Sequence, residues 1–257
     1  MAQQTRDPSR FVRKLQHFTT LSAEEKLALQ RFEVARNRIE SQTDLIVQGD
    51  VHAYIYIFRD GWAIRSRTLP DGACQILDVV LPGDVVGLAA PLFTIADHTV
   101  TSVTSVIAAT VTGDQLIELF RAHPRLGAAL CWHQAQEEAV VSEHLVNLGR
   151  RDAYRRLGHL FLELFWRLDA VGLVCDNAYD CPLSQPLLAD ALGLTAVHIN
   201  RTLQRLRRDR LLLHERPRVV IPDPIELAQA VGFDESYLHL SVMPLWLRRY
   251  LTRVETL

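Results

Sequence analysis

The chain has 257 residues, of which 48% are hydrophobic and 23% are charged, and its formal net charge is −2 at pH 7. This composition is typical of a folded globular protein and excludes a disordered chain, while the charge excludes a globally basic nucleic-acid binder. The length predicts a sizeable core and two modest domains. No apolar run approaches 18 residues and the opening, MAQQTRDPSR, lacks the layout of a signal peptide, so we expect a cytoplasmic protein with no membrane contact.

Residues 1–113 predict N-terminal helices followed by a unit of short strands. Residues 1–32 are expected to be helical, and Ser22-Ala-Glu-Glu25 is a capping box. Four runs rich in β-branched and aromatic residues follow, at 44–48, 54–58, 76–81 and 102–107, with turn signals such as Asp60-Gly61 and Pro82-Gly-Asp84 between them. Short strands joined by tight turns predict an antiparallel roll or barrel.

Residues 114–149 predict a helical connector. A short helix runs to about His123, Pro124 fits the first turn of the next helix, and Gly149 is expected to end that helix. The long helix, 125–148, carries an apolar stripe with polar interruptions. Its place between two domains predicts pairing with a second copy of the chain, although the stripe could also pack on its own roll. The residues expected at the dimer interface are Leu126, Leu130, His133, Val140, His144 and Leu148.

Residues 150–232 predict a DNA-binding unit that begins with a helix at 152–166 and a loop at 169–181. Ser184 can cap a helix, Gly193 fits a left-handed turn, and Thr195 can cap a second helix with a polar, basic outer face. This is the layout of a helix-turn-helix, whose second helix enters the DNA major groove; an ordinary helical hairpin is the alternative. Two β-prone pieces, 211–214 and 218–221, predict a hairpin that forms a wing.

Charge and cysteine placement add to this interpretation. Residues 198–218 hold seven arginines against two acids, a local surplus of the kind that phosphate contacts require. The four cysteines form no C-x-x-C pair and are expected to be reduced thiols, with a redox or metal role for Cys175 and Cys181 as the alternative.

We find no nucleophile triad, zinc-protease motif or phosphate-cradling glycine loop, and therefore expect no enzyme activity, no cofactor and no metal. The extension at 233–257 could cap the DNA-binding unit or add to the subunit contact.

The order of these elements resembles the Crp/Fnr superfamily of bacterial transcription regulators. The matching motifs are Val47-Gln-Gly-Asp50, the strand and turn at 54–61, Pro82-Gly-Asp-Val-Val-Gly87 and the segment 188–206, and the resemblance covers about residues 15–230. It implies an α+β fold: an N-terminal antiparallel β-roll like a cyclic-nucleotide-binding domain, a long dimerisation helix and a C-terminal winged helix-turn-helix. It also implies a homodimeric regulator that binds a two-fold-related site on double-stranded DNA and contacts RNA polymerase.

The resemblance places base contacts at Val197, His198 and Arg201, with Asn200 beside them. Arginine suits this role because its fork can pair with O6 and N7 of guanine. Val197 stands where the family often has a glutamate, so we expect it to touch a thymine methyl group instead of accepting from cytosine. Further DNA contacts are expected from two residues at helix starts, from the outer face of the second helix and from the wing: Gln185, Thr195, Arg205, Arg216 and Arg218.

For the roll, the resemblance implies an effector pocket lined by Gly87, Leu88, Ala89, Val141 and Ser142. In the cyclic-nucleotide branch a glutamate binds the ribose and an arginine the phosphate, but Leu88 stands at the glutamate position and no arginine or lysine lies between Arg67 and Arg121. We therefore expect no binding of cyclic AMP, because a buried phosphate needs a cation or a full set of donors.

Other effectors are less well defined by the sequence. No cysteine precedes Cys74, which excludes the iron–sulfur branch. No spacing selects a haem ligand among His52, His98, His133 and His144. An unknown ligand, a thiol signal through Cys74 or Cys131, and control without a ligand all remain open. The alternative function is a small-ligand-binding regulatory module that acts through protein contacts.

Overall fold

A β-roll, a long helix and a second helical unit follow one another in the computed structural model, which describes residues 8–89, 92–93, 95–240 and 244. Two short helices precede the roll, α1 (Arg10–Phe18) and α2 (Ala23–Phe32). The predicted capping box is confirmed: Ser22 accepts from the Glu25 amide at 3.1 Å, and the Glu25 carboxylate accepts from the Ser22 amide at 2.7 Å. No helix within the described residues is long and apolar enough to cross a membrane.

Two four-stranded antiparallel sheets form the roll, as predicted, with strand orders β1-β8-β3-β6 and β2-β7-β4-β5. The strands are β1 (Arg36–Ile39), β2 (Asp44–Ile46), β3 (Tyr54–Asp60), β4 (Ala63–Thr68), β5 (Cys74–Val80), β6 (Val85–Val86), β7 (Thr99–Ser102) and β8 (Val106–Thr112). The single strand predicted at 102–107 is wrong, because residues 103–105 separate β7 from β8 and belong to neither strand. The Val103 amide instead donates to the carbonyl oxygen of Trp62 at 2.7 Å, and the Thr104 hydroxyl accepts from the Trp62 amide at 2.9 Å.

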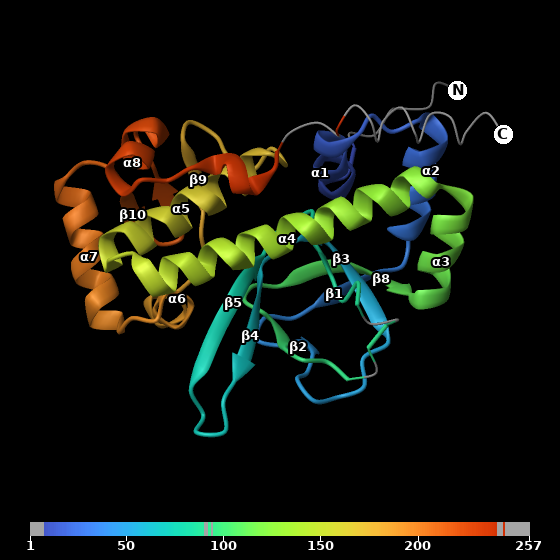
Figure 1. The fold of residues 1–257 in the computed structure, drawn as a ribbon, viewed down its shortest axis with the longest axis horizontal. Helices are drawn as coiled ribbons and strands as arrows, with labels where there is room; N and C mark the ends of the chain where they lie inside the picture. Colours follow the sequence, from blue (N-terminus) through green and yellow to red (C-terminus); the bar gives the residue numbers. More distant parts are fainter. Residues whose placement is uncertain (1–7, 90–91, 94, 241–243, 245–257) are drawn as a thin grey trace.

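The connector consists of α3 (Gly113–Ala122) and α4 (Pro124–Arg150), and α4 runs along most of the molecule (Figure 1). Pro124 occupies the first turn of α4, as predicted. Gly149 does not end the helix, which continues to Arg150. The guanidinium of Arg156 donates to the carbonyl oxygens of Leu148 and Arg151, each at 2.8 Å, and so satisfies acceptors that the helix end leaves free.

The C-terminal unit begins with α5 (Ala153–Asp169), which turns back over α4, and contains α6 (Gln185–Leu192), α7 (Ala196–Arg208) and α8 (Pro224–Val231). Its sheet has the order β10-β11-β9, formed by β10 (Leu213–Glu215), β11 (Arg218–Val220) and β9 (Ala178–Asp180). The predicted hairpin is therefore present, but the predicted loop at 169–181 is wrong where it contains β9. A strand of three residues has too short a pattern to be recognised before its partner is known.

Only the start of the C-terminal extension lies within the described residues. It contains a 3₁₀ turn, η1 (Glu235–Leu238), in which the Tyr237 hydroxyl donates to Glu163 of α5 at 3.1 Å. Gln136 of α4 donates to the carbonyl oxygen of Leu238. This part of the extension thus packs against both long helices, whereas the apolar-aromatic segment expected around Trp246 and Tyr250 lies outside the described residues.

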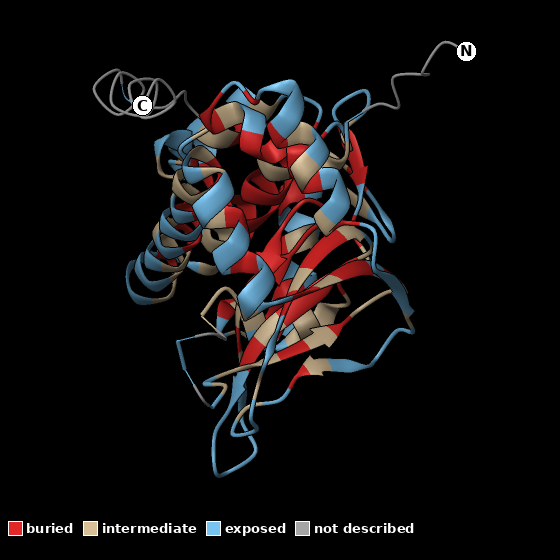
Figure 2. Ribbon diagram, turned by 90° about the vertical axis from the view of Figure 1, so that its right-hand side faces the viewer, coloured by how far each residue is buried: buried red, intermediate tan, exposed pale blue. Residues whose placement is uncertain are grey.

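The roll and the C-terminal unit share one apolar core. Trp62, Ile64, Ile76 and Val79 of the roll pack in the same buried cluster as α5, α6 and the small sheet. In Figure 2 the buried segments gather where the helices meet the strands, while the tip of the β4–β5 hairpin is exposed. The C-terminal unit is therefore held against the roll rather than tethered to it by a free linker.

Candidate DNA-binding interface

A helix-turn-helix occupies the C-terminal unit where the caps and the glycine predicted it. The Leu187 amide donates to the Ser184 hydroxyl at 3.4 Å at the start of α6, and the His198 amide donates to Thr195 at 3.2 Å at the start of α7. Gly193 ends α6 with a φ of +62°, in the left-handed region that favours glycine. The predicted caps and turn are thus confirmed, and they define where α6 ends and α7 begins.

The two faces of α7 differ in chemistry. Ile199, Thr202 and Leu206 are buried against the unit's core. The opposite face carries every residue predicted to contact DNA from this helix, and all of them are exposed: Val197, His198, Asn200, Arg201 and Arg205. Val197 is 72% exposed, which leaves its methyl groups available to meet another surface.

The exposed side chains of α7 differ in whether they contact other groups of the chain. Gln204 donates to the Asn200 side-chain oxygen at 2.9 Å. The guanidinium of Arg205 lies 4.4 Å from the centre of the Tyr154 ring, so Arg205 packs back onto α5. Among the described residues we find no ion-pair partner for Arg201, whose fork is therefore available to a base edge.

The wing places further arginines beside α7. Arg216 and Arg218 are both exposed on the β10–β11 hairpin, and Nη1 of Arg218 lies 3.5 Å from Asp180. Arg207 of α7 forms a similar exposed pair with Glu215 at 3.2 Å. Exposed pairs of this kind contribute little to stability, so a phosphate can replace the carboxylate at small cost. Gln185, the remaining predicted contact, is half-buried at the first position of α6.

The five residues predicted to form the effector pocket do not all line one cavity of this chain. Gly87 and Ala89 line a roll cavity of about 300 Å³, part of it open to solvent. Leu88 instead faces a separate apolar space beneath α1 and α2, with Phe11 and Leu29. Val141 and Ser142 lie on α4 and line neither space. Leu88 and Ala89 lie in a turn just after β6, where neighbouring side chains take different directions, and the sequence does not show which of them faces the cavity.

Two histidines that no sequence spacing had selected line the roll cavity. His98 Nδ1 lies 2.5 Å from the Asp97 carboxylate, which can only accept, so Nδ1 donates and Nε2 is left as an acceptor. The Nε2 atoms of His98 and His52 are buried without a hydrogen-bond partner among the described residues. Burial lowers the pKa of both rings, so the cavity presents neutral imidazoles. No lysine or arginine is among its described lining residues.

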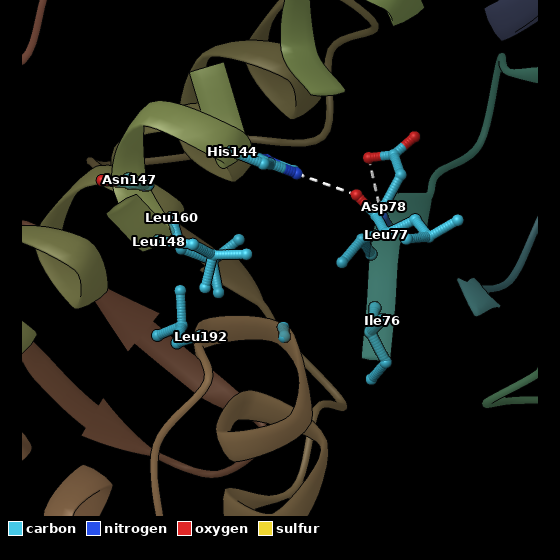
Figure 3. Close-up of a pocket in the computed structure, with 10 residues that line it drawn as sticks. Ile76, Leu77, Asp78, His144, Asn147, Leu148, Leu160 and Leu192 are labelled. Carbon is cyan, nitrogen blue, oxygen red and sulfur yellow. Dashed lines mark hydrogen bonds between the residues drawn. The ribbon is translucent and has the colours of Figure 1, made fainter. Parts of the chain in front are cut away.

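The predicted dimer-interface residues face the chain's own interior. Leu126, Leu130, His133 and Val140 are buried in this single chain. His144 bonds to the Leu77 carbonyl oxygen at 2.9 Å, and Leu148 lines the same small pocket between α4, α6 and β5 (Figure 3). We define the outer face of α4 as the exposed residues on its other side: Cys131, Gln134, Ala135, Glu138, Ser142, Leu145 and Val146.

Family models match both halves of the chain. A cyclic nucleotide-binding domain matches residues 36–123, and a Crp-like helix-turn-helix domain matches residues 155–230. Among curated proteins, the transcriptional activator protein FnrL of Cereibacter sphaeroides is 27% identical over 218 residues, which is 83% of this chain and 87% of that protein. The nitrogen fixation regulation protein FixK of Bradyrhizobium diazoefficiens is 28% identical over 183 residues, 70% of this chain and 76% of that protein.

A solved structure has the same fold. FixK2 from Bradyrhizobium japonicum superposes with a TM-score of 0.68 at 22% identity, covering 76% of this chain and 95% of that one. The two matched domains, in this order and joined by a long helix, are those that the sequence motifs indicated. The chain belongs to the Crp/Fnr superfamily.

Proposed function

We propose that this protein is a sequence-specific DNA-binding transcription regulator that acts through α7. The observation that carries the proposal is the exposed face of α7, where Arg201 has no ion-pair partner among the described residues and stands with an exposed valine and the arginines of the wing. An exposed surface with this surplus of arginine suits contact with DNA phosphates. The relatives named above, which carry the words activator and regulation in their names, support the same function.

The DNA site can be obtained by selection from a random library with the purified protein. We expect a two-fold-related sequence with guanine where Arg201 reads the half-site. Arg201→Ala should then weaken specific binding about 5- to 150-fold, because a bidentate pair with guanine is worth about 1–3 kcal/mol. Arg31→Ala, a change at an exposed arginine of α2, is the matched control. If Arg201→Ala binds the selected site as tightly as the parent at the same salt, α7 is not the reading helix.

We further propose that the protein acts as a homodimer through the outer face of α4. A symmetric dimer presents two α7 helices to two half-sites. The exposed Leu145 and Val146, 72% and 45% exposed, support this assignment. Contact with RNA polymerase from the bound site belongs to the same proposal, and purified polymerase with a promoter that carries the selected site would test it by transcript yield.

For the roll, we propose that neither cyclic AMP nor cyclic GMP is the effector. A cyclic nucleotide buries a phosphate anion, and the described lining of the roll cavity offers neutral histidines, the Asp97 carboxylate and apolar residues instead of a cation. Titration calorimetry with each nucleotide should show no saturable binding at micromolar concentration. Tight binding of either one would overturn this part of the proposal and would leave the DNA-binding function untouched.

A further inference from the structure

A buried ion cluster joins the DNA-binding unit to the roll. It consists of Arg167 and Glu163 on α5, Asp78 on β5, Asp84 in the turn before β6, and Lys14 on α1, and we call it the Arg167 cluster. All five side chains are buried; that of Arg167 is 8% exposed. Three parts of the chain that are far apart in sequence therefore meet in one cluster, in which Arg167 and Lys14 both contact Asp84.

Both terminal nitrogens of Arg167 are occupied by the roll. Nη1 donates to Asp78 at 3.0 Å and to Glu163 of its own helix at 3.2 Å. Nη2 donates to Asp84 and to the carbonyl oxygen of Val79, each at 2.9 Å. A guanidinium presents its donors in a fixed planar fork. The partners on both sides therefore define the position and the orientation of α5 on the roll.

Asp84 is held from several directions. Lys14 donates to it at 2.6 Å, and its second oxygen accepts from the Leu81 amide at 2.8 Å. Burial raises the pKa of Asp84, but the cations of Lys14 and Arg167 outweigh this effect and hold the pKa below its usual range. The carboxylate is thus ionised at neutral pH. It is a fixed anion at the tip of the turn that leads into β6.

The short strand β6 links the cluster to the roll cavity along the chain. β6 begins directly after Asp84, and Gly87, which lines the cavity, directly follows β6. The Val85 amide of the same strand donates to His133 of α4 at 3.2 Å. A displacement of this short segment would therefore reach both α4 and, through Arg167, α5.

The present arrangement leaves the reading face of α7 open. Val197, Asn200 and Arg201 are exposed although the unit is packed against the roll. The packing that the Arg167 cluster holds together therefore does not cover the reading face of α7. Buried ion pairs add little net stability compared with apolar packing, but they allow few alternative geometries, because any other arrangement leaves a charge unpaired.

We propose that Arg167 is a positioning residue for DNA binding: through its cluster it holds the two reading helices of a dimer at the separation that matches two half-sites. This inference rests on the proposed function and on the proposed dimer. It differs from a role in stability alone, because it concerns the geometry between two DNA-binding units rather than the fold of either. DNA sites of altered spacing separate the two roles.

The experiment uses the full chain and DNA selected by the parent protein. Arg167→Lys keeps the charge but removes the planar fork, and Asp84→Asn removes the negative charge that Arg167 and Lys14 face on the roll. Affinity is measured by fluorescence anisotropy for the full site, for one half-site, and for full sites lengthened or shortened by one base pair. Arg31→Lys, at an exposed arginine on α2, is the matched control.

We expect both variants to bind a single half-site as tightly as the parent does. The ratio of the affinity for the full site to that for the half-site should fall about tenfold in each variant. Their discrimination between the native and altered spacings should fall as well. Equal losses on half-site and full site would show a damaged fold and overturn the positioning role, as would unchanged affinity and spacing preference in both variants. If the parent selects no DNA, the proposed function itself has failed.

Discussion

His144 and Glu163 face each other where α5 crosses α4, with Nε2 of the ring 2.8 Å from the carboxylate. The other ring nitrogen lies 2.9 Å from the carbonyl oxygen of Leu77 on β5 (Figure 3). Both nitrogens therefore face acceptors, an arrangement that only the protonated imidazolium satisfies completely. Although burial lowers it, the charges of Glu163 and Asp78 raise the pKa of His144 to about 9.

This pair makes stability depend on pH in a defined direction. The folded pKa of about 9 lies above the ordinary value of 6.5, so the bound proton stabilises the fold fully below pH 6.5 and less as the pH rises through 9. His144→Gln should remove that decline and should lower the free energy of unfolding at pH 6.5 by about 1–3 kcal/mol. Urea unfolding at pH 6.5, 7.5 and 9 measures both effects.

His198 offers a matched control, because it is exposed on α7 and lies outside the joint between the helices. His198→Gln should leave the slope of stability against pH as in the parent. A parent protein whose unfolding free energy does not fall between pH 6.5 and 9, or a His144→Gln variant that keeps the fall, would contradict the assignment.

Gly158 lies where α5 packs against Val231 of α8. A Cβ atom at this position would lie 2.6 Å from a methyl carbon of Val231. Gly158→Ala should therefore destabilise the protein by about 1–3 kcal/mol through overpacking, despite the better helix propensity of alanine. The cost should shrink in a Val231→Ala background, which removes the clashing methyl groups. Thermal unfolding of the four members of this cycle measures the coupling.

Gly149 provides the comparison, since a Cβ atom there would meet nothing within 4 Å. Gly149→Ala is expected to leave stability unchanged or raise it by up to about 1 kcal/mol. Equal effects at the two glycines would show that α8 does not pack as closely on α5 as the structure has it.

The helix-turn-helix was predictable because its signals are local. Ser184, Gly193 and Thr195 act within a few residues of their own positions, so their chemistry defines helix ends without knowledge of the fold. The strand-rich roll was predictable for a similar reason. By contrast, the interruption between β7 and β8 at 103–105 depends on hydrogen bonds to Trp62, and β9 depends on pairing with β11. Neither dependence is visible in the sequence.

The partners of buried side chains were not predictable. Arg167 and Asp84 are 83 positions apart, and nothing in either segment indicates the other. The stripe on α4 showed correctly that one face is apolar, but periodicity does not say whether that face meets the same chain or a second copy. Leu126, Leu130 and Val140 meet their own chain. The sequence thus identified the helix and its apolar stripe, while its outer face required the structure.

The cysteines differ in their accessibility, which gives a prediction for chemical labelling. Cys74, Cys131 and Cys175 are exposed and Cys181 is buried. Burial raises the pKa of Cys181 to about 12, so it holds almost no thiolate at pH 8. A thiol reagent should modify Cys74 and Cys175 rapidly and Cys181 only on unfolding, as mass spectrometry of the digest would show. Rapid modification of Cys181, or a Cys175–Cys181 disulfide under mild oxidation, would contradict this environment.

The outer face of α4 gives the most direct test of assembly. On this face Leu145 is 72% exposed, and the exposed Val146 follows it in the chain. A buried arginine without a counter-ion is costly in an apolar interface, so Leu145→Arg should convert a dimer to a monomer while the fold of each chain is kept. Light scattering coupled to size exclusion gives the mass, and circular dichroism monitors the fold.

Leu27→Arg is the matched control, because Leu27 is a 48% exposed leucine on α2, far from α4's outer face in sequence. It should leave the mass of the assembly unchanged. The Leu145→Arg monomer should also lose the advantage of a full DNA site over a half-site, since two reading helices are no longer joined. A Leu145→Arg protein that stays dimeric would place the interface elsewhere. A parent protein that is monomeric at every concentration tested, and also on the full site, would remove the dimer from the proposal.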